Sequence, residues 1–234
     1  MKILCVSDQI DPLVYSNNIK ERFSGVDLIF SAGDLPMDYI DFIVSSLNRP
    51  MYFIFGNHNL EELAFHSRSS NTRYSFEAEE RFHGSGAVHI HGKIKRESNM
   101  IIAGLGGSMK YNNGTNQYSN AGMTFEIMKM LPGLIFNRIF RGRCLDILLT
   151  HASPFGIHDR KDQCHIGYKC FLWFMRFFKP RYLIHGHIHL YDLSEVRKTI
   201  YEKTTVINAY GHYLIDTDDI DNDVGGGKKG RNVV

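Results

Sequence analysis

Residues 28–34 read LIFSAGD, an apolar run that leads into a glycine and an aspartate. The same arrangement recurs at 51–57, MYFIFGN, and at 182–187, YLIHGH. Short apolar runs bounded by turn residues are typical of buried strands, and a glycine at the end permits a tight turn. The sequence therefore predicts several strands, each followed by a polar side chain at its carboxyl end.

The order of the predicted elements indicates an α/β protein. Buried strands are predicted at residues 3–6, 28–30, 51–55, 100–103, 145–149 and 182–184. Helical spacing occurs at 17–23 and 37–47, and a strand-helix-strand-helix order predicts a largely parallel sheet with right-handed crossovers. Later β-rich runs, at 196–201, 204–207 and 213–215, predict a second and more antiparallel sheet.

Composition is that of a globular protein, with 43% apolar and 22% charged residues in 234. The net charge of +2 provides no general attraction for nucleic acid or anionic lipid. No apolar stretch reaches the ~20 residues of a membrane span, so we expect a cytoplasmic protein with no membrane partner and four reduced cysteines. We predict one domain over residues 1–217 and a flexible tail over 218–234.

Two segments allow alternative interpretations. Residues 171–178 are apolar except at Arg176, which suits either a partner or membrane surface or, as we favour, a helix buried between layers. Arg138, Arg141 and Arg143 suit either a nucleic-acid patch or, as we favour, a solvated helix end.

Residues that can bind metal follow five of the predicted strands. They are Asp8, Asp34, Asn57, His151 and the pair His187 and His189. The carboxyl ends of neighbouring strands in an open α/β sheet converge on one crevice, so we expect these side chains to form one cluster. Carboxylate, amide and imidazole ligands suit Mn, Fe, Zn, Co or Ni. His89 and His91 share the His-x-His spacing but lie inside a predicted strand, and we expect them to bind no metal.

In order and spacing these motifs resemble those of the calcineurin-like metallophosphoesterase superfamily. The resemblance implies a four-layer α/β/β/α sandwich with two central mixed β-sheets. It implies that one metal takes Asp8, Asp34 and His189, and that the other takes Asp34, Asn57, His151 and His187. Asp34 would then bridge two divalent ions, with Mn expected first and Fe, Zn, Ni, Co or Mg as alternatives. His58 would bind no metal and would stand beside the phosphorus.

One departure from the family pattern concerns the first metal. Family members usually carry Asp-x-His at the first motif, whereas here Ile10 occupies the place of the histidine. The first site is therefore expected to be weak. Asp11 is a candidate for the missing ligand, although a surface turn before Pro12 is the favoured interpretation.

A second group of residues is predicted to shape the substrate pocket. Gly106 and Gly107 lie in a glycine-rich turn that can present backbone N–H groups to a phosphate. His158, Asp159 and His165 follow His151 within one loop, and of these we select His165 for the pocket.

The function predicted from these residues is hydrolysis of a small phosphorylated substrate, a phosphodiester or phosphomonoester, by a hydroxide activated by two metals. Asp34 and His58 are the predicted catalytic residues. Two alternatives stay open: a degenerate, non-catalytic metal-binding scaffold, suggested by Ile10, and a nucleic-acid-processing phosphodiesterase that uses the region around Arg141.

Overall fold

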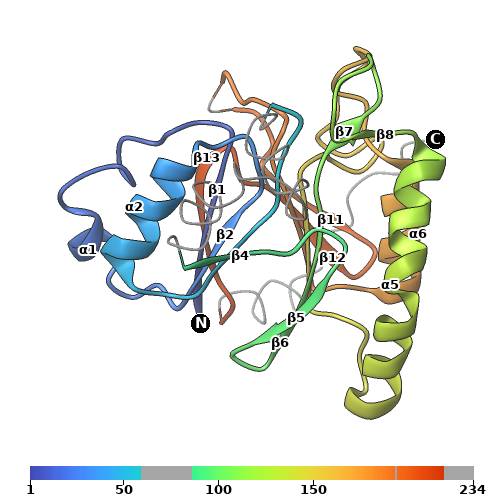
Figure 1. Ribbon diagram of the computed structural model, residues 1–234, viewed down its shortest axis with the longest axis horizontal. Coiled ribbons are helices and arrows are strands. Elements are labelled where there is room, and N and C mark those ends of the chain that lie inside the picture. The colour runs from blue at the N-terminus through green and yellow to red at the C-terminus, as the bar shows by residue number, and fades with distance from the viewer. Residues whose placement is uncertain (59–85, 193, 219–234) are drawn as a thin grey trace, which may run out of the picture.

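Two mixed β-sheets form the centre of the molecule in a computed structural model that describes residues 1–58, 86–192 and 194–218 (Figure 1). The first sheet has the order β13-β1-β2-β3-β4. Its strands are β1 (Lys2–Ser7), β2 (Leu28–Ser31), β3 (Met51–Phe53), β4 (Ala87–His89) and β13 (Gly211–Asp216). All its pairings are parallel except that of β13 with β1.

The second sheet has the order β11-β12-β10-β9-β6-β5. Its strands are β5 (Ile94–Glu97), β6 (Met100–Leu105), β9 (Ile147–Thr150), β10 (Tyr182–His185), β11 (Lys198–Tyr201) and β12 (Thr204–Asn208). The four inner strands run parallel, and the two edge strands pair antiparallel to them. A small separate pair joins β7 (Ser108–Met109) to β8 (Gln117–Tyr118).

Alternation of side chains along the strands produces the layers. Ile3 and Cys5 of β1 pack between the two sheets, against Ile147 and Leu149 of β9. The intervening residue Leu4 instead faces outward, where the helices α1 (Ile19–Arg22) and α2 (Met37–Leu47) cover the first sheet. Because successive strand residues point to opposite faces, one strand serves two cores.

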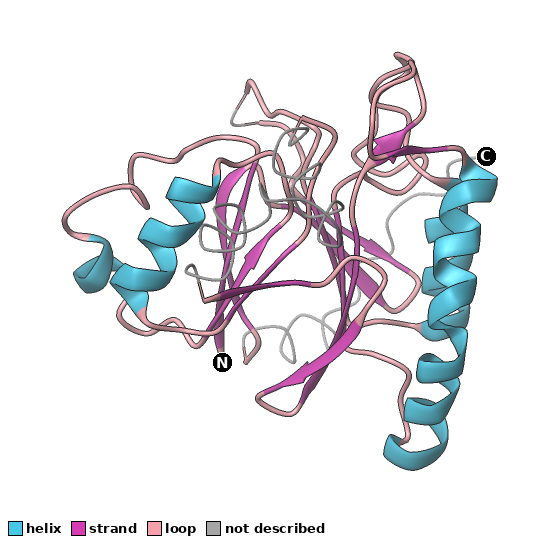
Figure 2. Cartoon of the chain, viewed as in Figure 1, coloured by secondary structure: helices cyan, strands magenta, loops and turns pink. Residues whose placement is uncertain are grey.

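Two helices cover the outer face of the second sheet (Figure 2). They are α5 (Asn120–Arg141) and α6 (Lys169–Phe178), and they pack against alternate residues of β6 and β9 such as Ala103 and Leu148. Helix α5 begins where Ser119 Oγ accepts from the Gly122 N–H at 3.0 Å, and it ends at Gly142, whose φ of 74° suits a glycine. The predicted four-layer α/β/β/α sandwich is confirmed.

Several predictions of local structure are corrected. Strand β13 joins the first sheet, not the second, because it pairs with β1 from Lys2 to Ser7. The second sheet is parallel at its centre, and only its edges are antiparallel. Helix α6 is not buried all round: Trp173 and Phe177 are exposed.

Two further predictions hold, for the arginine-rich segment and for the cysteines. The arginine-rich segment is a helix end, since α5 stops at Arg141 and Arg138 donates to the Gly142 carbonyl. All four cysteines are free. Among the described residues, no helix has both the length and the apolar character needed to cross a membrane. The predicted tail lies outside the described residues from position 219 onward.

Candidate metal centre

The six predicted metal ligands come together at the carboxyl ends of five strands. Asp8 directly follows β1, and its carboxylate accepts the His187 N–H at 3.0 and 2.9 Å, which joins the first sheet to the loop after β10. His151 directly follows β9, and its Nε2 lies 3.2 Å from Asp34 Oδ2 and 3.1 Å from Asn57 Oδ1. Parallel strands from both sheets therefore deliver their ligands to one place.

The backbone bends sharply where these ligands leave their strands. Asp8, Asp34 and His187 have φ values of 63°, 56° and 66°, in the left-handed region that non-glycine residues rarely adopt. Such conformations are held only when the surroundings demand them, and they concentrate at functional sites. Here the bends turn three polar side chains toward the cluster.

Two glycines are required by the approach of the carboxylates. A Cβ at Gly56 would overlap the Asp34 carboxylate, and one at Gly186 would overlap Ser7 and the Asp8 carboxylate. In the structure the space is filled by the two acidic side chains.

Asp34, His151 and His187 form the centre of the cluster. One ligand atom from each lies within 4.8 Å of the others. The side chains of His151 and Asp34 are almost completely buried, with 0% and 7% exposure. Among the described residues this is the group of histidine and acidic side chains close enough to share an ion, and its mixed nitrogen and oxygen donors suit a borderline divalent metal.

Backbone carbonyls orient both imidazoles. His151 Nδ1 lies 2.7 Å from the Ala32 carbonyl, and His187 Nε2 lies 2.8 Å from the Cys164 carbonyl. A carbonyl only accepts, so each of these nitrogens carries the proton. His151 Nε2 and His187 Nδ1 are left as the nitrogens that can bind a metal, an arrangement common around protein metal sites.

The charges within the cluster are coupled. Burial alone would lower the pKa of His151, but the negative charges of Asp34 and Asp8 raise it to about 9. Burial would raise the pKa of Asp34, but the charge and hydrogen bond of His151 lower it to about 2. Burial and the charge of His151 lower the pKa of His187 to about 3. The protein without metal therefore holds a proton on His151, next to two carboxyl groups.

Comparison with known proteins identifies the family. A family model for calcineurin-like phosphoesterases matches residues 1–191. The chain belongs to this family. The family is metal-dependent, and phosphoester hydrolysis is the general chemistry that membership supports for this chain. No curated protein matches the chain.

Two solved structures, with TM-scores above 0.5, show the same fold at low sequence identity. One crystal structure shares 13% identity with this chain at a TM-score of 0.64, and the aligned region covers 93% of this chain and 95% of the other chain. A protein of Thermus thermophilus, TT1561, shares 13% identity at a TM-score of 0.58, and the aligned region covers 89% of this chain and 88% of TT1561. A novel archaeal phosphodiesterase shares 13% identity at a TM-score of 0.48, and the aligned region covers 94% of this chain and 95% of the phosphodiesterase.

The residues predicted to hold the first metal are fewer and more exposed than those around His151. His189 Nε2 lies 3.9 Å from Asp8 Oδ1 and the histidine is 43% exposed. Ile10 is exposed and offers no ligand atom. Asp11 lies in a turn and not toward the cluster: its Oδ2 is 2.6 Å from His212 Nδ1 and its Oδ1 accepts the Leu13 N–H at 2.8 Å.

Next to the cluster, His58 is tied to it through its backbone. The His58 N–H donates to Asp34 Oδ1 at 2.9 Å.

Asn57 is oriented by residues that the sequence did not single out. Its Nδ2 donates to the Tyr111 hydroxyl at 3.3 Å, and Asn116 Nδ2 donates to the carbonyl of the preceding residue, Gly56, at 2.8 Å. No motif marks Tyr111 or Asn116, which lie far from Asn57 in the chain.

The glycine-rich turn after β6 does not present free N–H groups at Gly106 and Gly107. Gly106 N–H donates to His91 Nδ1 at 2.9 Å and Gly107 N–H donates to the Phe55 carbonyl at 3.0 Å. The predicted phosphate loop is therefore corrected to a structural turn. His91 serves as the acceptor for this turn.

The loop after His151 divides into two parts. His165 lies beside the cluster, with its ring centroid 5.1 Å from that of His187 and its Nδ1 2.7 Å from Asp162 Oδ1. His158 turns away from the cluster: its Nδ1 is 2.9 Å from His185 Nε2 and its Nε2 is 2.8 Å from Thr199 Oγ1. The sequence analysis considered both and selected His165, and the structure places His165, not His158, next to a predicted ligand.

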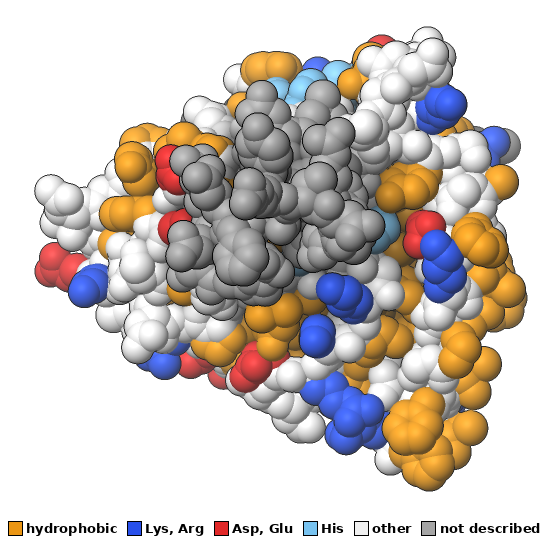
Figure 3. Space-filling view, viewed as in Figure 1, with side chains coloured by type: hydrophobic (Ala, Val, Ile, Leu, Met, Phe, Trp, Pro, Cys, Tyr) orange, Lys and Arg blue, Asp and Glu red, His pale blue; other side chains and the backbone are white. Residues whose placement is uncertain are grey.

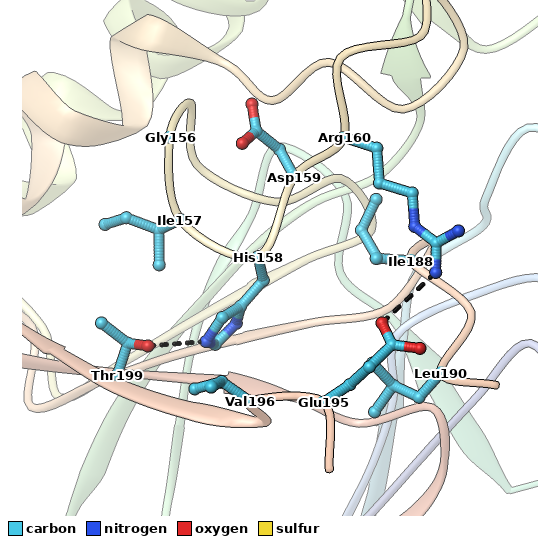
Figure 4. A pocket seen from close by; sticks show the side chains of 10 residues that line it. All are labelled: Gly156, Ile157, His158, Asp159, Arg160, Ile188, Leu190, Glu195, Val196 and Thr199. Atoms are coloured by element: carbon cyan, nitrogen blue, oxygen red, sulfur yellow. Dashed lines mark hydrogen bonds and ion pairs between the residues drawn. The ribbon is translucent and has the colours of Figure 1, made fainter. Parts of the chain in front are cut away.

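His158 and Ile188 line a separate pocket of about 360 Å³ (Figure 4). Arg160 crosses it to Glu195 at 3.4 Å and donates to the His189 carbonyl at 2.6 Å. Ile188 lines this pocket, whereas its neighbours His187 and His189 are predicted metal ligands. The pocket therefore lies behind the loop that carries His187 and His189.

Proposed function

We propose that this protein hydrolyses phosphate esters at a centre of two divalent metal ions. The observation that carries the proposal is the buried cluster of Asp34, His151 and His187, whose ligand atoms lie within 4.8 Å of one another. Asn57 and Asp8 are attached to it by hydrogen bonds to His151 and His187. This donor set fits a borderline cation, and Mn²⁺ is the ion that we propose.

The residues divide between the two ions as follows. Asp34, Asn57, His151 and His187 would hold one ion, and Asp8, Asp34 and His189 would hold the other. When bound, such a pair of ions supplies the charge that activates a water nucleophile and stabilises the phosphate oxygens. Asp34 belongs to both sets, so its charge would serve both ions.

Protons and metal compete for the same atoms. His151 Nε2, which now faces the carboxylate of Asp34 at 3.2 Å, must lose its proton before it can bind a cation. The carbonyl of Ala32 keeps the other proton on Nδ1, so the ring remains in the tautomer that presents Nε2. The protein therefore prepares the geometry of this ligand before the ion arrives.

His58 is proposed as the catalytic residue that binds no metal. Its N–H bond to Asp34 fixes the backbone beside the bridging carboxylate, and its side chain is exposed. In this position an imidazolium can stabilise charge on a phosphate or donate a proton to the departing alkoxide oxygen. His165, beside His187, is proposed to line the substrate pocket.

The direct test is hydrolysis of chromogenic mono- and diesters, p-nitrophenyl phosphate and bis-p-nitrophenyl phosphate. Chelation should abolish hydrolysis, and added Mn²⁺ should restore it. The ratio of the two rates will distinguish a monoesterase from a diesterase. If metal-loaded protein cleaves neither ester nor any nucleotide, the protein is a metal-binding scaffold and the proposal is wrong.

A further inference from the structure

Helix α5 carries a second apolar stripe on the side that faces solvent. Its buried stripe is Met123, Ile127, Met130 and Leu134, which pack on the second sheet. Its exposed stripe is Phe125, Met128, Pro132, Ile135, Phe136, Ile139 and Phe140. With about 3.6 residues per turn, the second stripe lies on the opposite side of the helix from the first.

The exposed stripe is too large to be incidental. The six large side chains, Pro132 aside, are each 49% to 69% exposed. At about 200 Å² for a large side chain, they present on the order of 700 Å² of apolar surface. A typical monomer has patches of roughly 300–600 Å², whereas one side of a stable protein interface covers about 800 Å². Figure 3 shows hydrophobic side chains gathered along this side of the molecule.

Two pairs of residues in the stripe lie symmetrically about Pro132. Phe125 and Ile139 lie seven residues before and after it, and Met128 and Phe136 lie four residues before and after it. A two-fold interface requires each patch to match itself when turned round. Two α5 helices that cross antiparallel at Pro132 satisfy this requirement. Phe125 would meet Ile139 of the second copy, Met128 would meet its Phe136, and the small proline would lie at the crossing.

The charges on the helix favour a protein partner over a lipid surface. A helix that lies on an anionic membrane carries Lys and Arg along its polar flanks. In α5 the arginines are confined to the C-terminal end, at Arg138 and Arg141, and Lys129 is neutralised by Glu126 at 2.8 Å. The outer face is otherwise uncharged, as the centre of an interface between proteins requires.

We infer that the protein forms a two-fold dimer through the outer face of α5, with Pro132 at the axis. The interface lies on the outer helical layer, whereas the metal cluster lies at the strand ends. The dimer proposal and the catalytic proposal are therefore independent of each other.

Sedimentation velocity on the full chain tests the inference. The wild type should sediment as a dimer, and Ile139→Glu should raise the dissociation constant at least about 100-fold because it places an unpaired carboxylate in an apolar contact. Ile200→Glu is the matched control: Ile200 is 63% exposed, against 69% for Ile139, but it lies on β11. Both substitutions are at exposed positions, and circular dichroism will verify folding.

Cysteine cross-linking tests the geometry. Pro132→Cys should form a covalent dimer under mild oxidation, since a disulfide needs Cα atoms about 4.4–6.8 Å apart and only residues at the axis meet their own copies. The wild type with its four cysteines and Ile200→Cys should not cross-link. A monomeric wild type at tens of micromolar would overturn the inference, and so would a dimer that Ile139→Glu leaves intact. Binding of a monomer to phosphatidylglycerol vesicles, lost in Ile139→Glu, would assign the face to lipid instead.

Discussion

Two clusters of buried histidines lie close together on either side of the loop after β10, and their electrostatics are opposite. In the metal cluster, Asp34 and Asp8 raise the pKa of His151 to about 9. Behind the loop, His158 contacts His185 and Thr199, and burial lowers its pKa to about 4. Acidic neighbours account for the difference, because both histidines are largely buried. A pair of buried histidines becomes a candidate metal site when carboxylates are buried beside it.

The hydrogen bonds of the second cluster fit two neutral rings. His185 Nδ1 lies 2.9 Å from the Gly186 carbonyl and must donate to it, which leaves Nε2 to accept from His158. His158 Nε2 then accepts from the Thr199 hydroxyl. Every ring nitrogen is used within the protein, so this cluster fixes the loop and leaves no nitrogen for a metal.

The largest expected effect follows from removing the carboxylate that defines the first cluster. Asp34→Asn should lower hydrolysis at least about 1,000-fold and reduce bound metal at both sites, since the bridging charge serves each ion. Metal analysis after gel filtration, together with the hydrolysis rate, will measure this. Asp38→Asn, an exposed carboxylate in the first turn of α2, is the control. Retention of two equivalents of metal in Asp34→Asn would show that Asp34 does not bridge.

A smaller effect is expected when the proposed catalytic side chain of His58 is removed and the metal ligands are kept. His58→Ala should lower kcat about 100-fold and leave metal content nearly intact, because the residue contacts Asp34 through its backbone N–H, which alanine retains. Metal loss equal to that of Asp34→Asn would mean that the role assigned to His58 is wrong.

The third expected effect concerns the ion proposed to bind at Asp8, which has fewer protein ligands than the ion at His151. With His189 at the periphery and Asp11 bonded to His212, the ion at Asp8 should bind more weakly than the ion at His151. Isothermal titration with Mn²⁺ should resolve two phases, and Ile10→His should tighten the weaker phase about 10-fold. Two equal, tight sites in the wild type would contradict this.

The smallest expected effect tests the second cluster. The folded protein keeps His158 neutral down to a pKa of about 4, whereas an unfolded histidine titrates near 6.5. The stabilisation from this group is therefore complete above pH 6.5 and is lost as the pH falls from 6.5 to 4. We expect about 1 kcal/mol, reduced from the full linkage value because the ring is partly exposed.

Urea unfolding of the metal-free protein between pH 4 and 7 measures this contribution. His158→Gln retains hydrogen-bonding groups but does not titrate, so its stability should depend less on pH than that of the wild type. An unchanged slope would mean that His158 titrates normally in the folded protein.

Much of the architecture follows from local sequence. Helix α2 has the predicted bounds, and apolar runs such as 28–30 mark the strands because burial on both faces demands them. Of the long helix α5 only the arginine-rich C-terminal end was predicted, since its two apolar stripes and Pro132 obscure the single period of an ordinary amphipathic helix. Strand β13 was assigned to the wrong sheet, because the pairing of the last strand with the first depends on contacts across the whole chain.

The set of metal-binding candidates can be read from the chain alone, because strand ends of a parallel sheet must converge and the order of the ligands is written in the sequence. How each candidate is used depends on the folded molecule. Folding sets the protonation of His151 against Asp34, turns His158 toward His185, occupies the N–H groups of Gly106 and Gly107, and ties Asp11 to His212. These outcomes depend on distance and burial between residues remote in sequence, and no local pattern encodes either quantity.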